Sequence, residues 1–129
     1  MISFVVHGPP VAAARPRLSR GKTYDPRSAE RKQVEAIIRE ELLTQGWELS
    51  SNLLAFHLEV YQQVPVSEVK RFQQPTYHVG RCDIDNFLKF YMDCCTGLAW
   101  KDDRQVVEVS GCKMNSLQPY VEICIQELV

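Results

Sequence analysis

The segment from Asp85 to Thr96 constrains the fold more than any other part of the sequence, because seven of its twelve residues are apolar and most of these are large. Its length and the glycine that follows it indicate a helix, with Asp83 or Asp85 as the N-cap. Within this helix Asp85, Lys89 and Asp93 recur every fourth residue and form one polar stripe. A helix that is apolar around most of its circumference is buried, so the stripe must face water, an ionic partner or a functional site.

Periodic patterns elsewhere predict one more helix and four strands. Apolar residues at helical spacing and a closing Gly46 predict an amphipathic helix from Arg27 to Gln45. Residues 8–26 and 65–82 are rich in proline or polar residues and are expected to be loops, the second of them mobile. A turn is expected near Asn115 between the last two strands. Alternating or β-rich runs predict strands at residues 2–6, 53–64, 106–113 and 119–128.

These elements predict the α+β class, in which a mixed sheet is covered by two helices and the order along the chain is β-α-β-α-β-β. A length of 129 residues fits one domain that covers residues 1–129. Apolar residues make up 45% of the chain and charged residues 24%, so a mainly disordered or fibrous protein is excluded.

Positive charge is concentrated at the start of the chain. Residues 1–32 carry a net charge of +5, whereas residues 33–129 carry a net charge of −6. The overall charge of −1 argues against a protein that binds nucleic acid through bulk positive charge alone. The long basic loop at residues 8–26 favours a phosphate-binding arm, although a flexible solvated arm fits its composition equally well. The candidates for DNA contacts in and beside this loop are Arg15, Arg17, Lys22 and Arg27.

The cysteine count and the apolar runs exclude other classes of protein. The five cysteines are an odd number without zinc-finger spacing, so we expect reduced thiols, with Cys94 and Cys95 serving as small apolar residues. Residues 1–10 lack the basic start of a secretion signal, and no apolar run reaches the ~18 residues of a membrane span. We therefore expect a cytoplasmic protein without membrane contact. A Gly-rich phosphate loop is missing, which argues against a nucleotide cofactor.

Carboxylates cluster around the buried helix. Asp83 and Asp85 are two residues apart, so their side chains leave one face of the extended chain where it enters the helix. With Asp102 or Asp103 they form a set of oxygen ligands suited to Mg²⁺, which usually takes one or two protein carboxylates plus water and phosphate. Such a site activates water for phosphodiester cleavage. Lys89, one turn after Asp85, adds a positive charge for the transition state.

Ordinary structural interpretations of these residues remain open. An aspartate before a helix is a common cap, acids and a lysine four residues apart form ion-pair ladders, and Asp102-Asp103 fits a solvated turn. Trp100 is either a packing residue or a wall of the site. The histidines are expected to be core or surface residues, without a Ser–His–Asp order; they are His7, His57 and His78.

Two motifs at fixed intervals carry a resemblance to a known family. They are Asp83-Ile84-Asp85-Asn86-Phe87-Leu88-Lys89, followed by Asp93, and Trp100-Lys101-Asp102-Asp103-Arg104-Gln105-Val106-Val107, followed by Lys113. On these residues the chain resembles the RusA family of Holliday-junction resolvases. A Gly-Pro-Pro turn and the Arg15-Pro16-Arg17 element extend the similarity to the N-terminal half. Departures such as Cys94-Cys95 look like core exchanges and leave junction selectivity and cleavage preference open.

The resemblance implies a homodimeric, Mg²⁺-dependent endonuclease that nicks two strands symmetrically at a four-way DNA junction. It implies that Asp83, Asp85 and Asp103 bind the metal and that Lys89 is a catalytic lysine. Asp102 matches an acid of less certain role and is kept among the metal-site candidates, and Lys113 is kept among the DNA contacts. A homodimer suits the substrate, because a four-way junction has two equivalent strands to cut.

The expected function is therefore the resolution of Holliday junctions in DNA recombination and repair, in a bacterial host or a prophage. One alternative is a broader nuclease that acts on flaps or replication forks. Another is a non-catalytic DNA-binding module that keeps the same fold. Cleavage of a four-way junction, a flap and a plain duplex would separate these functions.

Overall fold

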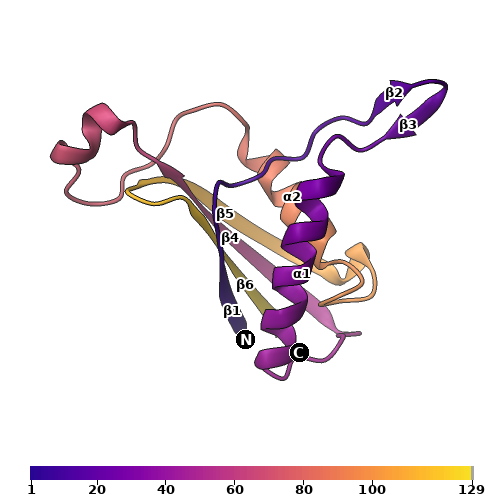
Figure 1. Cartoon of the computed structure of the whole chain (residues 1–129). Helices are drawn as coiled ribbons and strands as arrows, with labels where there is room; N and C mark the ends of the chain where they lie inside the picture. Colours follow the sequence, from indigo (N-terminus) through magenta and orange to yellow (C-terminus); the bar gives the residue numbers. More distant parts are fainter. Residues whose placement is uncertain (129) are drawn as a thin grey trace.

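The computed structural model describes residues 1–128 and contains a four-stranded sheet with two helices packed on one of its faces (Figure 1). The main elements are β1 Ile2–His7, β4 Leu53–Gln63, β5 Val106–Ser116, β6 Tyr120–Leu128, α1 Ser28–Thr44 and α2 Ile84–Cys95. The strands stand in the order β1-β6-β4-β5, with β4 parallel to β5 and antiparallel to β6. The predicted α+β class and mixed sheet are confirmed.

Alternation of side chains gives the sheet one buried face. The even-numbered residues of β4 from Leu54 to Val60 are buried, whereas the residues between them are only half-buried. The pairing keeps this alternation in register across the sheet, because Phe56 lies opposite Ile125 and Ile125 lies opposite Ile2. The buried face therefore forms one continuous core with the helices.

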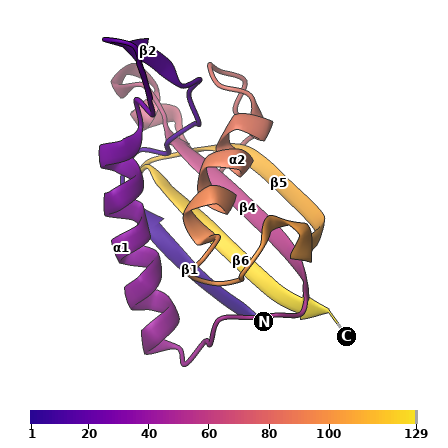
Figure 2. The same ribbon diagram turned by 90° about the vertical axis from the view of Figure 1, so that its right-hand side faces the viewer.

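The helix α2 is the buried helix that the sequence predicts. It packs on β4 and β5 and beside α1, which extends along the β1 side of the sheet (Figure 2). Asp85 and Lys89 stay exposed and Asp93 is half-buried, so the polar stripe faces solvent mainly along its first half. The buried side chains of α2 are Phe87, Phe90, Tyr91, Cys94 and Cys95.

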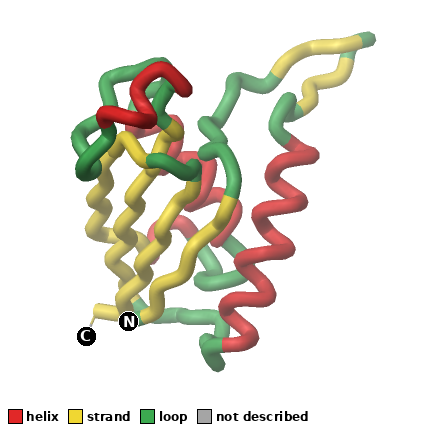
Figure 3. The backbone as a smooth tube through the Cα atoms, turned by 60° about the vertical axis from the view of Figure 1, so that its left-hand side comes forward, coloured by secondary structure: helices red, strands yellow, loops and turns green. Residues whose placement is uncertain are grey.

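The loop expected at residues 8–26 contains a β-hairpin that sequence reasoning missed. The strands β2 (Arg17–Ser19) and β3 (Lys22–Tyr24) pair across a two-residue turn. Both turn residues, Arg20 and Gly21, have positive φ angles of 53° and 76°, as a type I′ turn requires. All six strand residues are exposed, so no apolar alternation marks them in the sequence. The hairpin projects beyond the sheet from the start of α1 (Figure 3).

The remaining connections also differ from the prediction. A short 3₁₀ helix, η1 (Val66–Arg71), lies in the loop expected at residues 65–82, and a second, η2 (Asp103–Gln105), precedes β5. The six main elements follow the predicted order along the chain, and the structure adds the hairpin strands β2 and β3 and the two 3₁₀ helices to it. The turn after β5 joins strands that are not neighbours, because β4 lies between β5 and β6.

Three elements lie at the end of the sheet away from the N-terminus. They are the hairpin, η1 and the N-terminal end of α2 (Figure 1). The N-terminus and the end of β6 lie together at the opposite end, since Ile2 pairs with Ile125. The motif residues Asp83 and Asp85 therefore stand at an end of the molecule that also carries the basic hairpin.

Candidate active site

The N-terminal end of α2 presents two carboxylates to solvent. Asp83 occupies the N-cap position with an extended backbone (φ −75°, ψ 151°), but its side chain accepts no capping hydrogen bond. Asp85 lies in the first turn of the helix and is exposed. Neither carboxylate forms an ion pair within residues 1–128. Asp83 thus holds the cap position without using its carboxylate as a cap, and both acids keep free oxygen ligands.

The turn that leads into Asp83 is held by strand β5. Cys82 has a φ of 72°, in the left-handed region that non-glycine residues rarely adopt. The ammonium group of Lys113 donates to the carbonyl oxygen of Cys82 at 3.0 Å, and the N–H of His78 donates to the carbonyl oxygen of Lys113 at 2.9 Å. Lys113, predicted to contact DNA, therefore uses its ammonium group here to fix the backbone before the first acid.

The basic loop before the hairpin lies over α2. The N–H of Ala13 donates to the carbonyl oxygen of Asn86 at 2.9 Å, which ties the loop to the first turn of the helix. A cleft of about 410 Å³ between loop and helix is lined by Arg15, Asp85 and Lys89. The structure therefore brings together a predicted metal ligand, the predicted catalytic lysine and a predicted DNA contact.

A second cleft, of about 260 Å³, adjoins the first along the same helix and shares Lys89 with it. Here Arg31 Nη2 lies 3.4 Å from Asp93 Oδ2. Burial raises the pKa of Asp93, and the positive charge of Arg31 opposes that rise. Asp93 is thus paired with α1, and no ion pair within residues 1–128 joins Lys89 to Asp85 or Asp93. The simple ion-pair ladder along α2 is not formed.

Asp103 lies at the other end of α2. Its carboxylate accepts a hydrogen bond from the hydroxyl of Thr96, the C-cap of that helix. A helix of this length separates Asp83 from Thr96 by about 20 Å along its axis. Within residues 1–128, no group of three or more His, Cys, Asp or Glu side chains is arranged to hold a metal ion. One chain therefore presents Asp83 and Asp85 at one end of α2 and Asp103 at the other.

Asp102 has local partners of its own. Its carboxylate accepts a hydrogen bond from the N–H of Arg104 at 2.9 Å and lies 3.2 Å from the guanidinium group of the same residue. These bonds hold the pKa of Asp102 below its ordinary value. With Gln105 it completes a capping box on η2. Asp102 fits the solvated-turn interpretation better than that of a metal ligand.

The basic residues at this end of the molecule include several that the sequence analysis did not select. Arg17 and Lys22 lie on the exposed strands of the hairpin, as expected of an arm, and Arg20 lies at its tip. Lys70 and Arg71 end η1 at the same end of the sheet. Their adjacency in the sequence is a signal for a second basic cluster, and the fold places it at the same end of the sheet as the hairpin but on the opposite side (Figure 1).

Trp100 is a packing residue and not a wall of the site. Its side chain is fully buried and meets the Phe56 ring edge-on, with ring centroids 5.9 Å apart. Its indole N–H donates to the Thr96 hydroxyl oxygen at 3.1 Å. Trp100 therefore supports Asp103 indirectly, because Thr96 in turn contacts the Asp103 carboxylate.

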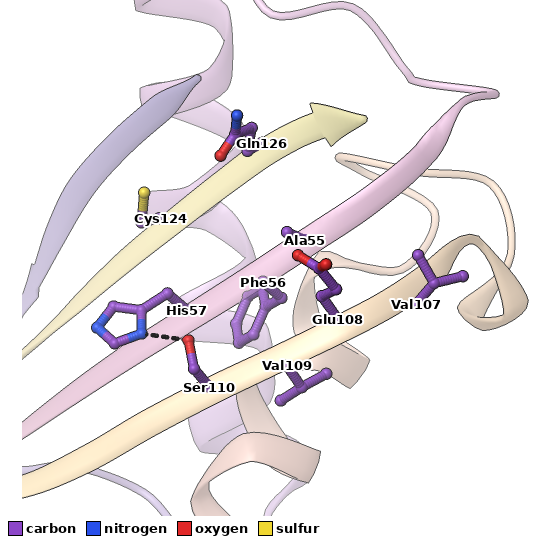
Figure 4. Close-up of a pocket in the computed structure, with 9 residues that line it drawn as sticks. All are labelled: Ala55, Phe56, His57, Val107, Glu108, Val109, Ser110, Cys124 and Gln126. Carbon is purple, nitrogen blue, oxygen red and sulfur yellow. Dashed lines mark hydrogen bonds between the residues drawn. The ribbon is translucent and has the colours of Figure 1, made fainter. Parts of the chain in front are cut away.

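The open face of the sheet holds another cleft, of about 630 Å³, lined by residues of β4, β5 and β6 (Figure 4). There His57 Nδ1 lies 2.6 Å from Ser110 Oγ, and His57 Nε2 lies 3.1 Å from Glu59 Oε2. The sequence did not predict this Ser110–His57–Glu59 arrangement, because only the parallel pairing of β4 with β5 sets His57 opposite Ser110. A nucleophilic serine needs N–H groups aimed at the oxyanion above it, whereas strand N–H groups lie in the plane of the sheet. We therefore interpret Ser110, His57 and Glu59 as polar surface residues of the sheet and not as a catalytic site.

The cysteines and the apolarity of the helices bear on two further expectations. All five cysteines are free, and Cys94 and Cys95 are buried in the core. Burial raises the pKa of the Cys94 thiol to about 12, so this side chain stays an uncharged packing group. No helix within residues 1–128 combines the length and the apolarity needed to cross a membrane.

Comparison with known proteins adds to this geometry. The family model described as Endodeoxyribonuclease RusA matches residues 7–126, a range that includes both motifs and both ends of α2. The chain is also 31% identical over 139 aligned positions to a Bacillus subtilis (strain 168) protein described as "Uncharacterized protein YqaN". That alignment covers 98% of this chain and 96% of the relative. The chain belongs to the RusA family of endodeoxyribonucleases.

Proposed function

We propose that this protein is a Mg²⁺-dependent, structure-specific endodeoxyribonuclease that resolves Holliday junctions by paired, symmetric nicks. Membership of the RusA family supports endonuclease chemistry on DNA junctions. The observation that carries the proposal is the pair of exposed carboxylates, Asp83 and Asp85, at the start of α2 beside Lys89 and Arg15. Acids that have no ion-pair partner in the described part of the chain and lie next to cations suit a site that receives both a metal ion and a phosphate.

The donor chemistry of Asp83 and Asp85 fits magnesium. Mg²⁺ prefers hard oxygen ligands and is usually held by one or two carboxylates, with water and substrate phosphate completing its shell. When bound, the ion would supply Lewis-acid stabilisation of phosphate charge and a more acidic water. Lys89 shares a cleft with Asp85 and would offset negative charge on the phosphate or the leaving oxygen. Arg15, in the same cleft, would hold the strand through a phosphate.

The protein is further proposed to act as a homodimer in which each site includes Asp103 of the partner subunit. Asp103 of the same chain lies a helix length away from Asp83, so it does not join this site without a rearrangement. A two-fold axis near the middle of the exposed stripe of α2 would set the start of one helix beside the end of the other. The half-buried Leu88 and Met92 offer apolar contact area along that stripe.

Mixed dimers test the shared site. Asp83→Asn and Asp103→Asn proteins are each expected to be inactive, but an equal mixture refolded together should regain about a quarter of the wild-type sites, as random pairing of two-fold dimers dictates. Single nicks on a junction, counted on a denaturing gel, measure the recovery. If the mixture stays as inactive as either protein alone, although sedimentation finds dimers, each site lies within one chain.

Substitutions that remove a positive charge from the hairpin are expected to lower the affinity for the junction and also to make that affinity less dependent on salt concentration. If Arg17 and Lys22 each contact one phosphate, Arg17→Ala and Lys22→Ala should each lower the slope of log K against log salt by about 0.9. Fluorescence anisotropy at several salt concentrations measures this slope. Arg39→Ala, on the exposed middle of α1, is the matched control and should leave it unchanged. Equal slopes for all three variants would remove the hairpin from the DNA interface.

The function itself is tested with purified protein and a synthetic four-way junction. Paired nicks at symmetry-related positions are expected with Mg²⁺, and no nicks without a divalent metal. Flap, fork and duplex substrates of the same sequence test the broader nuclease, which would cut them at similar rates. Tight binding without cleavage of any substrate would instead identify a non-catalytic DNA-binding module.

A further inference from the structure

Arg31 connects three elements beside the candidate active site. It lies in the first turn of α1, with Nη2 3.4 Å from Asp93 Oδ2 on α2 and Nε 3.8 Å from Asp25 Oδ2 at the end of the hairpin. Its Nε atom is buried and has no hydrogen-bond partner within residues 1–128. The side chains of all three residues are about one-third exposed, at 36%, 31% and 34% for Arg31, Asp93 and Asp25. Arg31 is therefore the cation that sits between two half-buried carboxylates.

Asp93 has a second cation within reach. Lys89 precedes it by four residues, the spacing at which an acid and a lysine on one helix meet. Lys89 and Arg31 both line the cleft that contains Asp93, and the charges of both residues act on the pKa of Asp93, against its burial. In the structure Asp93 pairs with Arg31, and Lys89 also lines the neighbouring cleft with Asp85. A half-buried carboxylate left without Arg31 would draw Lys89 toward itself, because an unpaired charge in such a place is costly.

We propose that Arg31 is a positioning residue, which occupies Asp93 and so keeps the ammonium group of Lys89 free to meet the phosphate beside Asp85. The inference rests on the proposed function, because it assigns Lys89 a task only if the protein cuts DNA. Arg31 touches no reacting atom in this scheme. It acts through the competition of two cations for the Asp93 carboxylate. Single and double substitutions can detect that competition.

Single-turnover cleavage of a four-way junction by excess protein with Mg²⁺ tests the scheme. Arg31→Met keeps the apolar stem of the side chain and is expected to slow cleavage about tenfold, the scale of coupling between neighbouring charges. Junction affinity without divalent metal should change less than about twofold, because Lys89 is displaced and not removed. Arg31→Lys keeps a cation against Asp93 and should retain most of the rate. Arg39→Met, farther along the same helix, should match the wild type.

The double variant decides between positioning and simple bracing. Adding Asp93→Asn to Arg31→Met removes the carboxylate that would capture Lys89, so cleavage is expected to recover to within about threefold of the wild type. If Arg31 only braces α1 against α2, the double variant should cut as slowly as Arg31→Met or more slowly, because it lacks both partners of the ion pair.

Thermal midpoints of all variants show whether a slow variant is merely unfolded. A double variant that is folded and still cuts slowly overturns the inference. If wild-type protein fails to cut, the proposed function fails first. If it cuts and Arg31→Met cuts equally well, only the role of Arg31 fails.

Discussion

The Asp83→Asn protein is expected to bind a four-way junction at least as tightly as the wild type and to cut it at least ~10³-fold more slowly. The asparagine keeps the size of the side chain but removes a charged oxygen ligand, so the metal that stabilises phosphate charge is lost. Binding survives because an acid that repels the DNA backbone has been neutralised while the basic hairpin is intact. Single-turnover cleavage and anisotropy titrations on the same junction measure the two quantities.

The structure supplies a stability control for this variant. The Asp83 carboxylate makes no capping hydrogen bond, so its replacement should leave the urea midpoint of unfolding almost unchanged. Glu40→Gln, at an exposed position of α1, is the matched change of charge and should cut at the wild-type rate. Normal cleavage by Asp83→Asn in Mg²⁺ would remove this acid from the catalytic site. Because asparagine caps a helix as well as aspartate does, the capping role is tested with Asp83→Ala, and a large loss of stability in that variant would return Asp83 to the role of a helix cap.

Trp100→Ala is expected to destabilise the protein more than other single side-chain truncations, by roughly 3–5 kcal/mol. The indole is fully buried, packs edge-on against Phe56 and donates its N–H to Thr96. Removing it leaves a cavity that the rigid sheet cannot close, and it also frees the Thr96 hydroxyl that contacts Asp103. Urea unfolding followed by circular dichroism measures the loss in free energy.

The second tryptophan is the control for this prediction. Trp47 is only partly buried and donates its indole N–H to the carbonyl oxygen of Ala99 at 3.0 Å. Trp47→Ala should therefore cost clearly less than Trp100→Ala, because less apolar surface returns to water. Equal losses for the two variants would contradict the assignment of Trp100 to the centre of the core.

Side-chain periodicity was enough to predict the main elements. Helix α2 is apolar on most sides and must be buried, and β4 alternates with a period of two and must cover one face. The hairpin was missed because its strands are wholly exposed, and a strand without a buried face has no pattern to detect. The separation of β5 from β6 by β4 was also beyond local patterns, since strand order depends on contacts between distant segments.

The sequence by itself determined which residue types gather around α2: the aspartates, the lysine one turn further on, and a basic segment upstream. Only the tertiary structure decided what each charge is free to do. Asp83 and Asp102 are equally plausible ligands in the sequence, yet within residues 1–128 the Asp83 carboxylate has no hydrogen-bond or ion-pair partner, whereas Asp102 is engaged by Arg104. The physical reason is that spacing along a chain limits which groups meet locally, whereas the availability of a carboxylate depends on cations and N–H groups brought to it by folding.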